Sequence, residues 1–74
     1  MPRYFFHVRD GVDIPDETGT ECADLAEARI QAIDTSGAMI RELGAKFWSD
    51  PEDWQMNVTD ADGAAQFTLR FSPR

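Results

Sequence analysis

The chain has 74 residues, of which 42% are hydrophobic, and its 14 acidic side chains outnumber 7 basic ones to give a formal net charge of −7. A chain this short forms one domain, which we place at residues 1–74, and leaves little room for the deep cleft that an enzyme needs. The single cysteine, Cys22, excludes an internal disulfide framework and a multi-cysteine zinc site, and the absence of a long apolar run or a signal-peptide core predicts a cytoplasmic protein.

The first predicted strand covers residues 3–9, which are β-prone. A turn at residues 10–11 leads into a short second strand. The register of this pair has two solutions. A two-residue turn places Ile14 opposite His7, whereas a three-residue loop places Ile14 opposite Val8 on the core face, and we favour the second.

The excess negative charge lies in one stretch of the chain. Between residues 10 and 27 there are seven acids and no base, whereas the rest of the chain carries seven of each sign. The acids of this stretch are Asp10, Asp13, Asp16, Glu17, Glu21, Asp24 and Glu27. Such a concentration predicts a solvated acidic rim, and a net-negative domain can bind nucleic acid only through a local basic face.

A long helix is predicted to begin at Asp24, because Asp24 and Glu27 resemble a capping box at the positive end of the helix dipole. Apolar and small residues then recur at alternating spacings of four and three, which predicts the face that packs on a sheet. This face comprises Ala26, Ile30, Ile33, Gly37, Ile40, Gly44 and Phe47, flanked by Leu25, Ala32, Met39 and Leu43. We expect Gly37 to permit close backbone approach and Gly44 to end the helix.

The last third of the chain predicts a β-hairpin. Residues 54–60 and 66–71 alternate strictly between apolar and polar, with Asp62-Gly63 between them. A two-residue turn there gives apolar residues apolar partners, and a one-residue slip would mix the two faces. The predicted pairs are Trp54 with Phe71, Met56 with Leu69, Val58 with Phe67, Gln55 with Arg70, Asn57 with Thr68 and Thr59 with Gln66.

Together these elements predict a single-domain α+β fold in the order ββαββ. One long helix packs on one face of a small, mostly antiparallel sheet. The helix crossover sets the C-terminal hairpin beside the first strand, and a parallel pair formed in this way would be right-handed. The predicted core face of the sheet is Tyr4, Phe6, Val8, Trp54, Met56, Val58, Phe67, Leu69 and Phe71.

Several short motifs carry a family resemblance. They are Met1-Pro2-Arg3-Tyr4-Phe5-Phe6, Asp10-Gly11, Asp16-Glu17-Thr18-Gly19-Thr20-Glu21, Asp24-Leu25-Ala26-Glu27-Ala28-Arg29, Val58-Thr59-Asp60 and Gly63. Over nearly its whole length the chain resembles a family of small uncharacterised proteins from rhizobia and related alphaproteobacteria, from which Cys22 and the tryptophan-bearing segment 47–54 depart. The family looks like a domain of unknown function, so the resemblance implies a bacterial protein but no catalytic residues. The strand, acidic turn and Asp-Leu-Ala-Glu-Ala helix start are also similar to HicB-type antitoxins.

No residue pattern indicates catalysis, a cofactor or a metal. His7 lacks the orienting carboxylate of a general base, so we expect a surface or packed histidine, with catalysis or a metal site shared between chains as alternatives. Cys22 precedes the helix, where the dipole would favour a thiolate but neighbouring acids would raise its pKa, so we expect an inert small residue. The acidic turns at residues 10–21 and 60–63 lack the ligand pattern of calcium loops.

The second face of the sheet, opposite the helix, is the most informative surface. It carries Arg3, Phe5, His7, Arg9, Gln55, Asn57, Thr59, Gln66, Thr68 and Arg70, with three arginines and no acid. Three interpretations remain open. The face is a solvated sheet surface, a protein–protein surface with Phe5 exposed, or a platform on which single-stranded nucleic acid stacks.

We therefore expect a small non-enzymatic interaction module. The predicted interaction surface comprises Arg3, Phe5, His7, Arg9 and Arg70. Its partner is another protein or a second copy of the chain, giving a homo-oligomer, because small domains gain stability by association. The alternative is an antitoxin-like or nucleic-acid-associated accessory protein.

Overall fold

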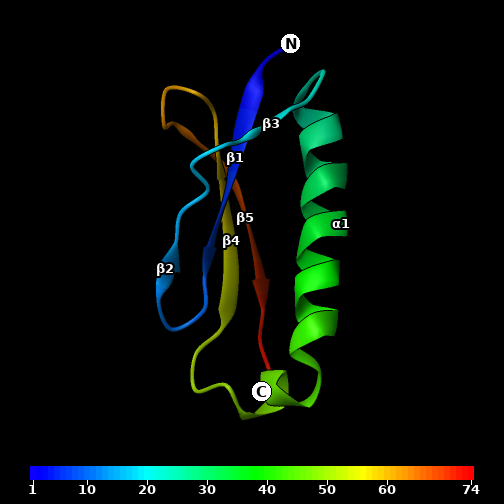
Figure 1. The fold of residues 1–74 in the computed structure, drawn as a ribbon, viewed down its shortest axis with the longest axis vertical. Helices are drawn as coiled ribbons and strands as arrows, with labels where there is room; N and C mark the ends of the chain where they lie inside the picture. The colour runs from blue at the N-terminus through cyan, green and yellow to red at the C-terminus, as the bar shows by residue number, and fades with distance from the viewer.

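A computed structural model describes residues 1–74 and shows one long helix lying along a small sheet (Figure 1). The strands are β1 (Arg3–Arg9), β2 (Asp13–Ile14), β3 (Thr20–Glu21), β4 (Trp54–Thr59) and β5 (Ala65–Phe71). Helix α1 (Leu25–Leu43) and the 3-10 helix η1 (Gly44–Ser49) separate β3 from β4. The α+β fold class is confirmed, with β3 and η1 as additional short elements.

The sheet has the strand order β2-β1-β4-β5, and every neighbouring pair is antiparallel. β3 pairs with β1 at Arg3 and Tyr4, at the opposite end from β2. The C-terminal hairpin lies beside β1 as expected, but the crossover pair is antiparallel, so the parallel arrangement is wrong. The reason is that β2 and β3 return the chain to the start of β1. The helix therefore begins at that end, and β4 enters at the other, where Gln55 faces Arg9.

The first hairpin has the register that we favoured. Val8 pairs with Ile14, and Arg9 pairs with Asp13, which leaves a three-residue loop between the strands. Gly11 in this loop has a φ of 76°, a conformation that glycine adopts without steric cost.

In the second hairpin the predicted pairs from Trp54 to Val58 are all confirmed. Beyond Val58 the register shifts, so Thr59 faces Ala65 where we expected Gln66. The two-residue turn is therefore wrong. The Asp60 carboxylate accepts hydrogen bonds from the backbone N–H groups of Asp62 and Ala64, both at 2.9 Å, and stabilises a wider loop.

Both ends of α1 have specific caps. The Asp24 carboxylate accepts from the backbone N–H of Glu27 at 2.9 Å, and the Glu27 carboxylate accepts from Ala23 at 3.2 Å. This reciprocal arrangement confirms the predicted helix start. At the other end Gly44 has a φ of 58° and donates its N–H to the Ile40 carbonyl, so the helix stops where expected.

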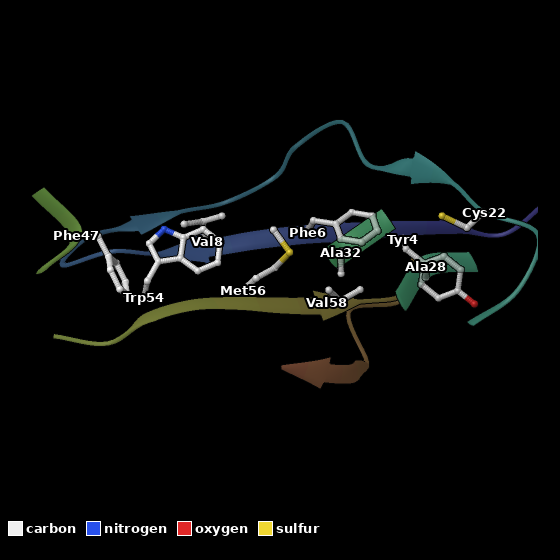
Figure 2. Packing of buried hydrophobic residues seen from close by; sticks show 10 residues of the cluster. All are labelled: Tyr4, Phe6, Val8, Cys22, Ala28, Ala32, Phe47, Trp54, Met56 and Val58. Atoms are coloured by element: carbon white, nitrogen blue, oxygen red, sulfur yellow. The ribbon is translucent and has the colours of Figure 1, made fainter. Parts of the chain in front are cut away.

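The core lies between α1 and strands β1 and β4 (Figure 2). All nine predicted core-face residues take part, with the three from β5 only partly buried. In Figure 2, Phe47 and Cys22 lie at opposite ends of the cluster. The buried residues of this cluster are Tyr4, Phe6, Val8, Cys22, Ala28, Ala32, Phe47, Trp54, Met56 and Val58.

The predicted helix face is wrong along most of its length. Ile30 and Ile33 are 62% and 63% exposed, and the helix buries Ala28, Ala32 and Ser36 instead. Large sheet side chains already fill the core, so only small helix residues allow close packing. Ala26, Gly37 and Gly44 are also exposed and Ile40 is half-buried, whereas Phe47 and the predicted flanks Leu25, Ala32, Met39 and Leu43 contribute to the core.

Gly37 does not have the role that we expected. Apart from its chain neighbours and the backbone of its own helix, no atom lies within 4 Å of the position that its Cβ would occupy, so no other element approaches it. The helix continues through this residue.

Candidate functional site

The face of the sheet opposite α1, which we term the open face, is arranged in cross-strand rows. The strand registers place Arg9, Gln55 and Arg70 side by side on β1, β4 and β5. The next row is His7, Asn57 and Thr68, and Phe5 faces Thr59 beyond it. The predicted interaction residues therefore do share one face, with Arg3, Phe5 and His7 towards one end and Arg9 and Arg70 at the other.

The row of Arg9, Gln55 and Arg70 lines a shallow polar groove of about 370 Å³. The other lining residues are Pro51, Glu52, Asp53 and Arg74. Arg74 is neutralised by Asp53 at 2.8 Å, whereas Arg9 reaches Asp13 only at 3.8 Å and both side chains are largely exposed. Arg70 makes no ion pair. The groove therefore holds three guanidinium groups together with the carboxylates of Glu52 and Asp53, and only Arg74 has a close ion pair.

His7 has both ring nitrogens engaged within the chain. The backbone N–H of Asp16 donates to Nδ1 at 3.0 Å, and Nε2 lies 3.2 Å from the Thr59 hydroxyl. Because Nδ1 is the acceptor, Nε2 carries the proton and donates to Thr59. His7 also stacks on Phe5, with ring centroids 6.3 Å apart and an interplanar angle of 10°. The histidine thus ties a loop to the sheet.

Asp16 anchors that loop to the edge of β1. Its carboxylate accepts from the backbone N–H groups of Phe6, Thr18 and Gly19 at 3.0–3.1 Å. Partial burial raises the pKa of Asp16, but the three backbone donors outweigh this effect and, with His7 nearby, hold the pKa below its ordinary value. The bond to Phe6 satisfies a β1 amide in the gap between β2 and β3.

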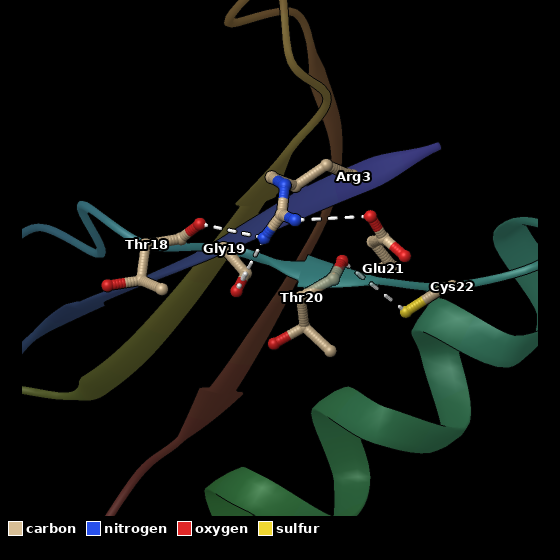
Figure 3. A network of polar contacts seen from close by, with 6 residues as sticks. All are labelled: Arg3, Thr18, Gly19, Thr20, Glu21 and Cys22. Carbon is tan, nitrogen blue, oxygen red and sulfur yellow. Dashed lines mark hydrogen bonds and ion pairs between the residues drawn. The ribbon is translucent and has the colours of Figure 1, made fainter. Parts of the chain in front are cut away.

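Arg3 closes the same edge from the other side (Figure 3). Its guanidinium donates to the carbonyls of Thr18 and Gly19 at 3.0 and 3.3 Å and forms an ion pair with Glu21 at 3.2 Å. A Cβ on Gly19 would lie 2.8 Å from Arg3 and 2.9 Å from Phe5, so the loop backbone packs directly on both side chains. Phe5 is consequently half-buried, where we expected it to be exposed.

A family model described as "Domain of unknown function (DUF6894)" matches residues 3–72. The chain belongs to this family. No curated protein and no solved structure matches it. In this DUF6894 domain, the loop that covers the outer edge of β1 accounts for three residues of the motif at positions 16–21, namely Asp16, Thr18 and Gly19.

Cys22 and His7 occupy separate environments in this DUF6894 domain. Cys22 is 1% exposed, and its Sγ lies 3.9 Å from the Thr20 carbonyl. Burial raises the pKa of the thiol, and the carboxylates of Glu27 and Asp24 raise it further, in the direction that we predicted. No group of three or more His, Cys, Asp or Glu side chains could hold a metal ion, and no helix is long and apolar enough to cross a membrane.

One end of the acidic segment approaches the loop before β4. Hydrogen bonding with Asp50 raises the pKa of Asp10, and the same interaction lowers the pKa of Asp50. Asp10 also borders a cleft of about 260 Å³ whose other lining residues are Val8, Ile14, Met39, Glu42, Leu43 and Trp54. The cleft lies at the β2 side of the helix, away from the open face.

Sequence patterns missed two residues of this site. Arg74 lies in the tail beyond the hairpin, where no periodicity places it. The charge pattern assigns Asp16 to the acidic rim, although an Asp two residues before Thr18 and three before Gly19 is the spacing of a side-chain-capped turn. That spacing could have identified its structural role.

Proposed function

We propose that this domain is a non-enzymatic, protein-binding module that recognises an acidic segment of a partner through the open face. The observation that carries the proposal is the row of Arg9, Gln55 and Arg70. A planar guanidinium binds a carboxylate through two parallel hydrogen bonds, and two arginines on either side of an amide can hold successive carboxylates. These arginines are notable in a molecule with a net charge of −7.

The residues at the two ends of the open face are not equally free to bind a partner. Arg3 and His7 are occupied by contacts with the loop at residues 16–19, and Phe5 is packed beneath Gly19. We therefore place the centre of binding at Arg9 and Arg70, with the predicted residues at the other end serving mainly to shape the face.

Nucleic acid is the second candidate, as an antitoxin-like or accessory role would imply. Arginines also bind phosphate, and the net charge of −7 opposes a nucleic acid and a long acidic chain alike, so charge alone does not decide between the two candidates. Stacking of bases needs exposed aromatic rings, and Phe5 is half-buried. The half-burial of Phe5 therefore favours a protein partner.

The test is a titration of the labelled protein with a synthetic glutamate-rich peptide and, separately, with single-stranded oligothymidylate, followed by NMR. We expect the peptide to shift the amide signals of Arg9, Gln55 and Arg70. The Arg9→Ala/Arg70→Ala variant should lose the effect, while Arg29→Ala/Arg41→Ala, which removes two exposed helix arginines, should retain it. Shifts caused only by the oligonucleotide would favour the second candidate, and no shift with either ligand would refute the proposed surface.

A further inference from the structure

The outer edge of β5 has no partner in the chain. β5 is seven residues long and pairs only with β4, whereas the outer edge of β1 is covered by β2, β3 and the Asp16 loop. Alternate backbone N–H and C=O groups of β5 therefore point away from the sheet. Apart from Arg70 this strand carries no charged residue and no proline, and its register shift against β4 is confined to the end at Gln66, so Phe67–Phe71 is regular.

Apolar side chains adjoin this edge on the helix side. Phe67, Leu69 and Phe71 of β5 are only partly buried. Thr35 and Met39 of α1 line a cleft with Ile14 on the β2 side. At about 100° per residue, Ile33 and Ile40 lie on the opposite flank of the helix, towards β5. We term Ile33, Ile40, Phe67, Leu69 and Phe71 the apolar band.

We infer that β5 and the apolar band form a two-fold interface with a second copy of this chain, through antiparallel β5–β5 pairing. The arrangement of charge along the edge argues for this occupant. Asp60 and Asp62 precede β5, whereas Arg70, which has no ion pair within the chain, lies near its C-terminal end. An antiparallel two-fold axis places each acidic end beside the basic end of the other copy, and a parallel arrangement would oppose like charges.

A two-fold axis at Thr68 also places apolar side chains of the two copies opposite each other. It sets Phe67 opposite Leu69 of the second copy and brings Arg70 towards the acidic turn that precedes β5 of the second copy. Apolar residues then meet on the helix side, and no arginine lies opposite the same arginine of the second copy.

The area that β5 and the apolar band can bury is small and indicates a weak dimer. A seven-residue strand is about 23 Å long at about 3.3 Å per residue. The molecule is 18 Å across its shortest axis, so a strip of that width covers about 400 Å² per copy and about 800 Å² for the pair. This is below the roughly 1,200–2,000 Å² of stable specific interfaces and is typical of weak, transient association. The dimer is therefore concentration-dependent, with dissociation at micromolar concentrations or above.

The experiment is sedimentation equilibrium from about 1 μM to about 1 mM, a range that brackets such affinities. We expect the mass to rise from monomer to dimer for wild type. Ile33→Lys should weaken dimerisation at least tenfold and should fold normally, because Ile33 is 63% exposed within the chain. Val12→Lys is the matched control, since Val12 is 65% exposed at the opposite edge of the sheet and should dimerise like wild type.

Charge reversal tests the orientation. Asp62→Lys should weaken the dimer, and Asp62→Lys/Arg70→Glu should restore it, because the axis brings the turn of one copy towards Arg70 of the other. A wild type that stays monomeric to about 1 mM, or an Ile33→Lys variant that associates like Val12→Lys, would overturn the inference. Arg9→Ala separates this interface from the proposed peptide site, because it should leave dimerisation unchanged.

Discussion

The two edges of the sheet are closed by different means. The outer edge of β1 is covered by two two-residue strands and by Asp16, which uses one carboxylate to accept three backbone hydrogen bonds. The edge of β5 is seven residues long and has apolar side chains beside it but no covering loop. A small domain can thus close one edge with polar groups from its own loop and leave the other suited to a second chain.

Removal of the Asp16 carboxylate should produce the largest loss at the closed edge. Asp16→Ala leaves the amides of Phe6, Thr18 and Gly19 without their acceptor. The exposed amide of Thr18 can bond to water instead and the other two are only partly buried, so the loss is close to that of one charge-assisted hydrogen bond, about 1.5–3 kcal/mol. We expect the free energy of unfolding to fall by about 2–3 kcal/mol, measured by urea denaturation. Asp13→Ala, which removes only an exposed ion pair, should change it little. Equal effects of the two substitutions would contradict this account.

The loop backbone should tolerate no side chain at Gly19. Its φ is 75°, and an added Cβ would contact Arg3 at 2.8 Å and Phe5 at 2.9 Å. Gly19→Ala should cost about 2 kcal/mol from strain and displacement together. Gly63→Ala separates the two causes, since its φ is 83° but no atom lies nearby, and it should cost about 1 kcal/mol. Thermal unfolding of both variants distinguishes these values.

The closed edge should also be sensitive to acid. The pKa of Asp16 is lower in the folded protein than its ordinary value of 3.8, so the unfolded chain binds its proton more readily. The associated stability is present above that value and is lost as the pH falls through the folded pKa. Urea denaturation at a series of pH values below about 5 should show a shallower decline for Asp16→Asn than for wild type. A decline of the same slope would show that other carboxyl groups account for the acid sensitivity.

The smallest effect is expected on the free side of the helix. Gly37 has open space around its Cβ position and lies within α1, so Gly37→Ala should stabilise the protein by about 0.5–1 kcal/mol through helix propensity. A higher melting temperature in circular dichroism would confirm it. Destabilisation would indicate a partner for this position in solution.

The sequence predicted those features in which local chemistry and side-chain alternation agree. The registers around Val8 and Val58 follow from alternation, because a slip would bury polar groups. The helix face could not be predicted in this way, since two stripes have the same spacing and the apolar one contains Ile30 and Ile33. The large side chains of β1 and β4 decide between the stripes, and that is a property of the assembled layers.

The sequence predicted which residues share the open face, but it did not predict which of them are free to bind a partner. Alternation placed Arg3, Phe5, His7, Arg9 and Arg70 on one face, and the strand registers agree. Alternation could not show that the loop at residues 16–19 packs on Phe5 and donates a hydrogen bond to His7. The path of this loop depends on the pairing of β3 with β1 at Arg3 and Tyr4.

The antiparallel pairing of β1 with β4 has a consequence for how the chain folds. Each hairpin can form from neighbouring residues, but His7 and Thr59, which meet across the central pair, are 52 positions apart. Closing so long a segment costs chain entropy before any aromatic side chain is buried, and topologies with such distant contacts fold more slowly than local ones. The joining of β1 to β4 is therefore the expected rate-limiting event, and α1, which lies between them in sequence, shortens the distance that the chain must search.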